Sequence, residues 1–428
     1  MFVAAGPQIA PANSTPSDDG DQRPLEPPLS VVVLPFANLS NDPAQEYFAD
    51  GVTEDLTADL SQIPGSVVIA RDTAFTYKGV PVDTQQIGRE LGVRYVLEGN
   101  VRRAGEQISL NVLLIDAQTG TRIWAKQFDT DRANLADAQE QITDNLARVV
   151  DGHPEVAAAR RKSTETDPDA HDFIMKGRAW FYRPYSLASW QEAQTAFERA
   201  LEIDARSVEA RVDLARVLGG RLADGWSSSL QQDPARAGRL LREALERDAN
   251  RSTAHFAMGV LRRMQNGLTE AQNEFETAIA LNPNDARASY QLGVTLMFLG
   301  HPEAGIPHIE KAIRLDPNDP EATVIYWALG TSHLLLGHVD KAIDSLDKAR
   351  AANPRIWYPN LYLAGALGLS GDINMAKADL AESLKLKPEI NSLARMRAYN
   401  AWITNPENWA LQEQTLNVGL RRAGLPDE

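Results

Sequence analysis

The chain has 428 residues, of which 43% are hydrophobic and 24% are charged, an ordinary globular composition. This length predicts two or three domains. The formal net charge of −15 disfavours nucleic acid and anionic lipid surfaces as partners. Cysteine is absent, which excludes disulfides, cysteine-ligated zinc and a thiol nucleophile.

Residues 1–29 are rich in proline, serine, aspartate and glycine, and we expect a disordered linker there. The sequence contains no run of about 20 apolar residues, so no membrane span is expected. The stretch from Met1 to Pro7 is too short for the core of a signal peptide. Two alternatives stay open for it: an ordinary chain start, or the end of a membrane helix. A preceding membrane helix would place the protein outside the cytoplasm, in the periplasm, and otherwise it is cytoplasmic.

Residues 30–150 predict an α/β domain with a mixed sheet. Short apolar or alternating runs predict strands, and a 3.6-residue apolar period, as in Phe48, Val52, Leu56 and Leu60, predicts helices. The expected strands cover residues 31–36, 66–70, 95–103, 107–116 and 121–128, and the expected helices cover 48–63, 83–91 and 136–150.

Three groups of polar residues in this domain are candidate sites. Asp50 and Glu54 share a helix face, as a general acid/base pair would, although a solvated face near a helix N-terminus is the favoured interpretation. Asn38, Ser40 and Asn41 follow the first strand, where a polar site or a turn with Asp42-Pro43 is expected, and we favour the turn. The polar and aromatic loop from Arg71 to Lys78 is the better contact candidate, and its predicted contact residues are Arg71, Phe75, Tyr77 and Lys78.

After a linker helix at residues 151–169, a repeat of about 34 residues begins. Small residues recur at Ala244, Ala278, Ala312, Ala349 and Ser383, with spacings of 34, 34, 37 and 34. Turn residues recur at Asn266, Gly300, Gly337 and Gly371 with spacings of 34, 37 and 34. Two landmarks in the same register indicate a repeated helical hairpin.

The repeat positions resemble the tetratricopeptide (TPR) pattern. In one repeat Leu292-Gly293 lets two helices approach, Gly305 and Ala312 lie where they cross, Ile309 fills the space between them, and Pro317 ends the second helix. The resemblance implies an all-α solenoid of six repeats over residues 170–388. Residues 389–428 are expected to form a helical cap on its last apolar face.

The first domain resembles the TolB-N-terminal-like domain. The resemblance lies in Leu34 to Ser40, Tyr47 to Leu56, Tyr95 to Val101 and Thr119 to Ala125. In bacteria this domain is often followed by TPR repeats, and family members commonly carry an adenylate or guanylate cyclase domain or a winged-helix DNA-binding domain in front of it. This chain has neither, so the resemblance implies a sensory, regulatory or interaction part without catalytic function. The alternative is the regulatory region of a membrane-linked cyclase signalling protein.

In TPR arrays the first helix of each hairpin lines the concave face, and this gives a predicted partner-binding groove. Its members are apolar or aromatic residues with two arginines: Phe256, Arg263, Met264, Arg287, Tyr290, Met297, Phe298, Trp327, Thr331, Tyr358 and Leu361. Such a groove suits an amphipathic helix or an extended apolar segment of a protein partner, or self-association. The competing interpretation is a groove filled by the chain itself, through Leu411 to Leu420 or through the first domain.

The sequence contains none of the phosphate-loop, dinucleotide, zinc-protease or nucleophile-elbow motifs. Its seven histidines are scattered, and the one close pair, His333 and His338, fits helix ends better than a metal site. We therefore expect a non-enzymatic interaction scaffold that requires no cofactor and no metal.

Overall fold

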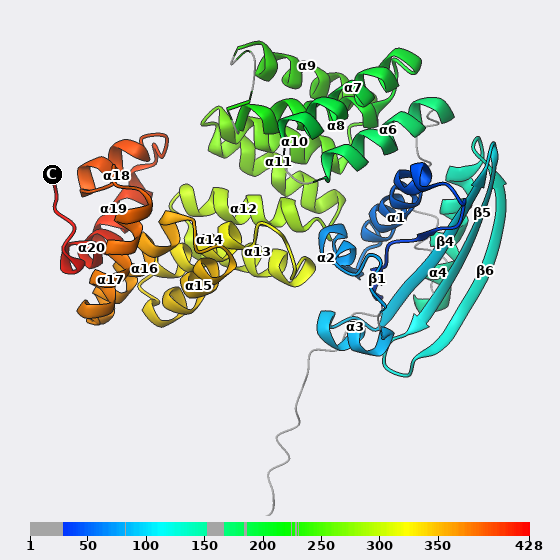
Figure 1. Ribbon diagram of the computed structural model, residues 1–428. Helices are drawn as coiled ribbons and strands as arrows, with labels where there is room; N and C mark the ends of the chain where they lie inside the picture. The colour runs from blue at the N-terminus through cyan, green and yellow to red at the C-terminus, as the bar shows by residue number, and fades with distance from the viewer. Residues whose placement is uncertain are drawn as a thin grey trace, which may run out of the picture.

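The computed structural model describes residues 29–81, 83–151, 167–183, 186–223, 225–226, 229 and 231–428. The predicted linker at 1–29, except Leu29, and most of the linker helix at 151–169 lie outside the described residues. Figure 1 shows an α/β domain at one end of the molecule and a curved helical array that runs away from it.

The α/β domain contains a mixed sheet with strand order β3-β1-β4-β5-β6. β1 (Ser30–Val33) pairs in parallel with β3 (Val67–Val68) and β4 (Tyr95–Ala104), and the short β2 (Ala37–Asn38) also pairs in parallel with β4. β5 (Gln107–Asp116) and β6 (Thr121–Asp131) continue as an antiparallel meander. The predicted mixed sheet is confirmed, and β2 is an addition that the sequence pattern did not indicate.

Helices cover both faces of this sheet. On one face α1 (Glu46–Ser61) and α4 (Leu135–Asp151) pack over Val31 and Val33. On the other face α2 (Arg71–Phe75) and α3 (Thr84–Leu91) pack over Val32 and Leu34. The continuous apolar run at the first strand follows from this burial on both sides. The sequence predicts a loop from Arg71 to Lys78, but in the structure the first five residues of this segment form the helix α2.

The array consists of paired antiparallel helices. In the described residues the pairs are α6 (Pro168–Phe181) with α7 (Leu187–Ile203), α8 (Val208–Ala223) with α9 (Gln232–Arg247), α10 (Ser252–Met264) with α11 (Leu268–Leu281), α12 (Ala286–Phe298) with α13 (Pro302–Leu315), α14 (Ala322–Leu335) with α15 (Val339–Ala352), and α16 (Trp357–Ser370) with α17 (Ile373–Leu386). This all-α array behind an α/β domain is the predicted fold class.

The small residues of the repeat act as the pattern predicts. A Cβ atom placed on Gly293 would lie 2.5 Å from Ile309 Cγ1 and 2.8 Å from the Gly305 carbonyl oxygen. A Cβ atom placed on Gly259 would likewise lie 2.6 Å from Phe275 Cε1. A larger side chain at these positions would push the two helices of the hairpin apart, because packed interiors leave no spare room.

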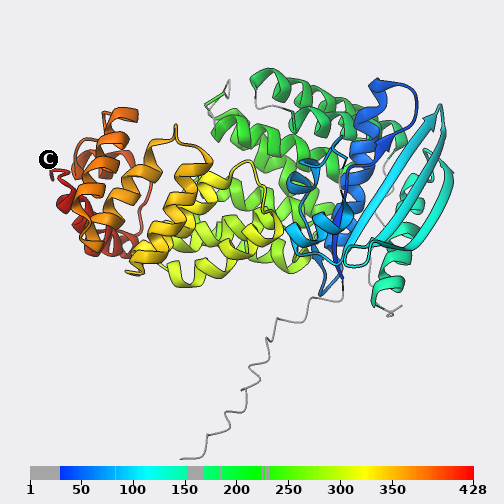
Figure 2. The ribbon, with the colours of Figure 1, turned by 60° about the horizontal axis from the view of Figure 1, so that its bottom comes forward.

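Three short helices follow the last hairpin: α18 (Leu393–Tyr399), α19 (Pro406–Gln414) and α20 (Leu416–Ala423). They lie at the far end of the array from the sheet, as both views show (Figure 1, Figure 2). α20 packs on α16, where Gly365 and Gly419 bring the two backbones together. Among the described residues, no helix is both long enough and apolar enough to cross a membrane.

Candidate functional site

The α/β domain is docked on the array, and one apolar side chain from α6 joins the two cores. Met175 is buried among the core residues of the α/β domain, beside Phe48 and Val52. Gly51 on α1 makes room for it, because a Cβ there would lie 2.6 Å from Met175 Cγ. The helices α1 and α6 are thereby held in direct contact.

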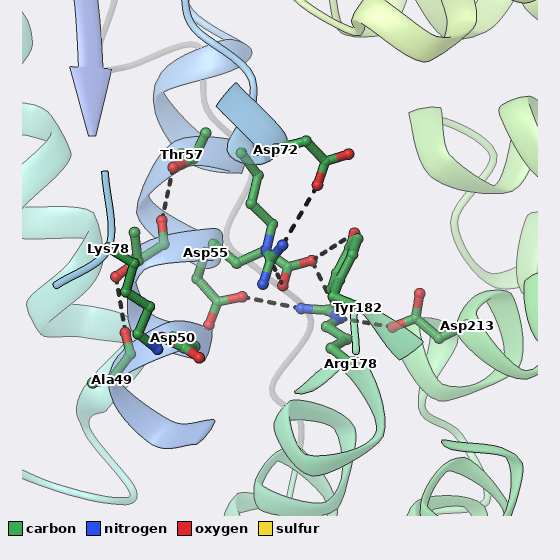
Figure 3. A network of polar contacts seen from close by, with 12 residues as sticks. Ala49, Asp50, Asp55, Thr57, Asp72, Lys78, Arg178, Tyr182 and Asp213 are labelled. Carbon is green, nitrogen blue, oxygen red and sulfur yellow. Dashed lines mark hydrogen bonds and ion pairs between the residues drawn. The ribbon is translucent and has the colours of Figure 1, made fainter. Parts of the chain in front are cut away.

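Figure 3 shows a polar part of this interface, with Asp55 of α1 facing Arg178 of α6. Arg178 of α6 lies between both parts: its Nε donates to Asp213 Oδ2 at 2.7 Å and its Nη1 to Asp55 Oδ1 at 3.2 Å. The Tyr182 hydroxyl donates to Glu54 Oε1 at 3.3 Å. Burial works to lower the pKa of Arg178, but the carboxylates of Asp213, Glu54 and their neighbours hold it well above its ordinary value. Arg178 therefore stays charged and ties α1 to the array.

The candidate acid/base pair on α1 belongs to this interface. Asp50 is ion-paired with Lys78, and Glu54 lies 4.0 Å from Arg178 Nε and 3.6 Å from Arg71 Nε. Burial raises the pKa of both carboxyl groups, while the neighbouring cations oppose that shift. The role of the pair is structural, but the expectation of a solvated face was wrong, because the Asp50 and Glu54 side chains are only 18% and 17% exposed.

A second line of contacts joins the edge of the sheet to two turns of the array. Asn284, in the turn before α12, accepts from the Val68 amide at 3.2 Å and donates to the Ser61 carbonyl at 2.9 Å. Asp316, in the turn before α14, accepts from the Thr73 amide at 3.0 Å and the Thr73 hydroxyl at 2.6 Å. The α/β domain therefore contacts the array from its first hairpin to the turn that joins its fourth and fifth hairpins.

The predicted contact loop lies at this junction, and its residues bind within the chain. The Arg71 guanidinium lies 3.8 Å from the ring centroids of both Phe75 and Tyr182. Lys78 is paired with Asp50 and, at 2.9 Å, with Glu46. Tyr77 donates to Glu90 at 3.0 Å.

The far half of the predicted groove is covered by the C-terminal helices. Met297, Phe298, Thr331 and Leu361 are all buried. Asn408 of α19 donates to the Met297 carbonyl at 2.8 Å, and Trp402 stacks edge-on against Phe298 with ring centroids 4.6 Å apart. Leu361 shares its core cluster with Leu416 and Leu420 of α20. Of the alternatives that the sequence left open, the chain's own C-terminal segment fills this half of the groove.

The other predicted groove residues are partly buried. Trp327 and Tyr358 contact each other edge-on with centroids 5.3 Å apart, and Arg263 and Met264 lie at the end of α10. The Arg263 Nε is buried without a hydrogen-bond partner, and burial lowers the pKa of this guanidinium.

The array contains a pocket of about 210 Å³, which is lined by residues of α6 to α10, α12, α14 and the turn before α14. Three predicted groove residues, Phe256, Arg287 and Tyr290, line it. Val260, on the same groove-lining helix as Phe256, lines it as well. The lining residues that the sequence reasoning missed include Phe181, Trp190, Arg216, Gly219, Gln291, Asp319, Glu321 and Ile325. The repeat register at α8 could have indicated Arg216 and Gly219, but the spacing from Ala200 to Ala244 is 44 residues, and this longer interval obscured the register there.

The two arginines of the pocket are already paired. Arg216 donates to Asp213 at 3.1 Å, and Arg287 donates to Asp72 of α2 at 2.7 Å. Burial raises the pKa of Asp319, with Asp72 adding to the shift and Arg287 opposing it. Gln291 Oε1 is a buried acceptor without a hydrogen-bond partner.

The remaining candidates have structural partners. Asn38 Oδ1 accepts from the Ser40 amide at 2.9 Å, and Asp42 caps the turn that follows. The rings of His333 and His338 are 5.7 Å apart, and burial lowers the pKa of His333 to about 4. Within the described ranges no group of three or more histidine, aspartate or glutamate side chains is arranged to hold a metal ion.

Comparisons with known proteins cover both parts of the chain. The model of the second domain of HilA/YgeH-like transcriptional regulators matches residues 28–145, and a tetratricopeptide repeat model matches residues 256–320 and 290–355. The solved structures of pilF from Pseudomonas aeruginosa and of YrrB, a TPR protein with an unusual peptide-binding site, are similar at 19% and 20% identity. The pilF match has a TM-score of 0.44 and covers 56% of this chain and 99% of pilF. The YrrB match has a TM-score of 0.38 and covers 48% of this chain and 99% of YrrB.

Two curated relatives are longer than this chain. This chain is 35% identical over 257 residues to a protein named putative adenylate cyclase 3 from Rhizobium meliloti. The aligned region covers 59% of this chain and 43% of that relative. This chain is 25% identical over 137 residues to the Tol-Pal system protein TolB of Methylococcus capsulatus, covering 32% and 31%. The chain thus spans less than half the length of these relatives. It combines tetratricopeptide repeats, a protein-interaction module, with an N-terminal α/β domain.

Proposed function

We propose that this chain is a non-enzymatic interaction and regulatory module that holds a segment of a protein partner in the open part of its concave face. The observation that carries the proposal is the pocket lined by Phe256 and Tyr290, which is open although the chain's own C-terminal helices cover the far half of the predicted groove. An open pocket with an apolar floor and a few polar groups is the usual form of a binding site.

The docked α/β domain supports a regulatory role. It contacts the array mainly through ion pairs and hydrogen bonds, with Met175 as the apolar anchor. Polar interfaces of this kind between domains permit relative motion. Because Asp72 of this domain binds Arg287 of the pocket, a partner in the pocket and the position of the domain are linked through shared contacts.

Site-specific photo-crosslinking tests the proposal. A benzophenone amino acid replaces Val260, which lines the pocket, and in a control chain it replaces Glu310, which is exposed on α13. In source cells we expect a defined polypeptide to be captured from position 260 and not from position 310. Equal capture at both positions, or none at position 260, would contradict the proposal.

A second candidate is a regulatory region of an adenylate cyclase signalling protein, and the 257-residue similarity to the Rhizobium relative supports it. The test replaces the matching region of that relative with this chain and measures cyclic AMP formation. A change of at least twofold when Arg178 is replaced by glutamine in the hybrid would support regulation through the docked domain. Equal cyclic AMP formation would count against it.

A further inference from the structure

The groove-lining helix α10 carries an arginine beside the open pocket. Arg263 lies three residues after Val260 and seven after Phe256, so the three side chains share one face of the helix. Val260 and Phe256 line the pocket, and so does Tyr290 of α12. Burial raises the pKa of Tyr290, and the nearby Arg263 guanidinium opposes that shift. Arg263 therefore lies next to the pocket, one helical turn further along the groove.

The Arg263 guanidinium differs from the two arginines that line the pocket, because it has no partner. Arg216 and Arg287 donate to Asp213 and Asp72 at 3.1 and 2.7 Å. In the part of the chain that the structure describes, no residue forms a hydrogen bond or an ion pair with Arg263, and its Nε is buried. Burial lowers the pKa of Arg263, and no carboxylate of the described residues offsets this shift.

An unpaired cation in this position costs free energy. Arginine keeps its proton even where burial disfavours the charge, so the cost is not relieved by deprotonation. Asp319 and Glu321 act on the ionisation of Tyr290 but not on that of Arg263, so they are too distant to neutralise it. A ligand carboxylate recovers the cost, because it accepts two parallel hydrogen bonds from a guanidinium group.

The adjoining pocket has unused apolar space. Gly219 on α8 lines it, and a Cβ atom placed there would meet no atom within 4 Å. The next residue, Gly220, differs, because Trp190 lies 2.1 Å from its Cβ position and already fills the space. Phe256 and Ile325 continue the apolar lining on the inner helices. The pocket therefore fits an apolar side chain next to the cation.

We propose that the concave face binds a polypeptide segment with an internal aspartate or glutamate, whose carboxylate pairs with Arg263 while a neighbouring apolar side chain enters the pocket at Gly219. This inference rests on the proposed partner-binding function and specifies its chemistry. A segment with a neutral side chain at this position leaves the guanidinium unpaired, and a basic one adds repulsion, so Arg263 selects for an acidic residue.

Fluorescence polarisation with the full chain and three labelled decapeptide pools tests the inference. All peptides are acetylated and amidated, so that no terminal carboxylate takes part. The first pool combines leucine and phenylalanine with glutamate at two positions. The second has glutamine in place of glutamate, and the third keeps glutamate but has serine in place of leucine and phenylalanine.

We expect the first pool to bind about tenfold more tightly than either of the others, because hydrogen bonds between charged groups are strong. The net charge of −15 repels the glutamate peptides, so a preference for them cannot come from unspecific attraction to the surface.

Two variants of equal charge locate the site. Arg263→Gln should remove the preference for glutamate over glutamine. The matched control is Arg262→Gln, which removes the same charge from the adjacent, partly exposed residue on another face of α10 and should leave the preference unchanged.

Urea unfolding of the chain without peptide gives an independent measurement. Arg263→Met should leave the midpoint unchanged or raise it, because it removes an unpaired charge from a partly buried position. Arg287→Met should lower the midpoint, since it leaves Asp72 without its partner from the array. A lower midpoint for Arg263→Met would show that its guanidinium stabilises the chain and would contradict the inference.

Three binding results would also overturn the inference: equal binding of the glutamate and glutamine pools, an unchanged preference in Arg263→Gln, or no binding of any pool. The crosslinking experiment distinguishes its failure from that of the proposed function. If position 260 captures a partner but the glutamate pool has no advantage, the groove function stands and the assigned chemistry is wrong. If position 260 captures nothing, both proposals fail.

Discussion

Removing the Asn284 side chain should release the sheet edge from the array. Its amide makes three hydrogen bonds to the α/β domain, to the Val68 amide, the Ser61 carbonyl and the Ser66 hydroxyl, at 3.2, 2.9 and 2.9 Å. A net value of about 0.5–1.5 kcal/mol for each bond, together with the cost of the unsatisfied groups left behind, gives about 2–4 kcal/mol for Asn284→Ala. This destabilises docking by a factor of roughly 30 to 700, since about 1.4 kcal/mol corresponds to tenfold.

Hydrogen exchange measures this loss. The amides of Ala70 and Thr73 report on docking, because they bond to the Leu315 carbonyl and to Asp316 and do not touch Asn284. Their exchange should accelerate by the stated factor in Asn284→Ala. The matched control is Asn318→Ala in the turn before α14, where the contact to Thr73 is made by the backbone amide and survives the substitution. Faster exchange at Val68 with unchanged exchange at Ala70 and Thr73 would refute the reasoning that the domain docks as one unit.

Further predictions concern stability and pH. Met175→Ala should destabilise the chain by about 2–5 kcal/mol in urea unfolding, because it leaves a cavity between the two cores; a loss below 1 kcal/mol would count against the shared core. Gly293→Ala should cost about 1–3 kcal/mol in the same assay, because its Cβ would collide with the facing helix; an unchanged midpoint would contradict the close helix approach. Docking should weaken as the pH rises: burial and neighbouring carboxylates raise the pKa of Asp316, and the carboxylates that face His171 raise the pKa of that imidazole although burial opposes them. Both shifts favour the protonated form of the group in the docked state. The stabilisation by Asp316 is complete below its ordinary pKa of 3.8, and that by His171 is complete below its ordinary pKa of 6.5. Each is lost as the pH rises through the raised pKa of the group in the docked state. Since the chain has no native cysteine, labels at Gln127→Cys and Glu303→Cys can follow the distance between the domain and the array, which should increase with pH; a constant distance would refute this prediction.

The repeat architecture was predictable because its signals are local and periodic. Gly293, Gly305 and Ile309 are set by one helix crossing, and the same crossing recurs along the array, as at Gly259 and Phe275. The strands and helices of the first domain were predictable for a similar reason, since apolar periodicity reports which face each element buries. The short β2 and α2 lack such a period and were missed.

The docking of the two domains was not predictable. Asn284 and Asp316 occupy turn positions of the repeat, where asparagine and aspartate are expected for local hydrogen bonding alone. Their partners are more than 200 residues away in the chain. The filling of the groove by the C-terminal helices is also a long-range effect, because Asn408 and Met297 are separated by 111 residues. The sequence left that possibility open without deciding it.

Hydrogen exchange of the full chain with and without the polypeptide captured at position 260 tests the central claim most directly. The account predicts slower exchange on the inner helices that line the pocket, α8, α10, α12 and α14, with the convex helices α11 and α13 unchanged. Protection confined to the C-terminal helices or to β6 would show that the partner binds elsewhere and would contradict the account.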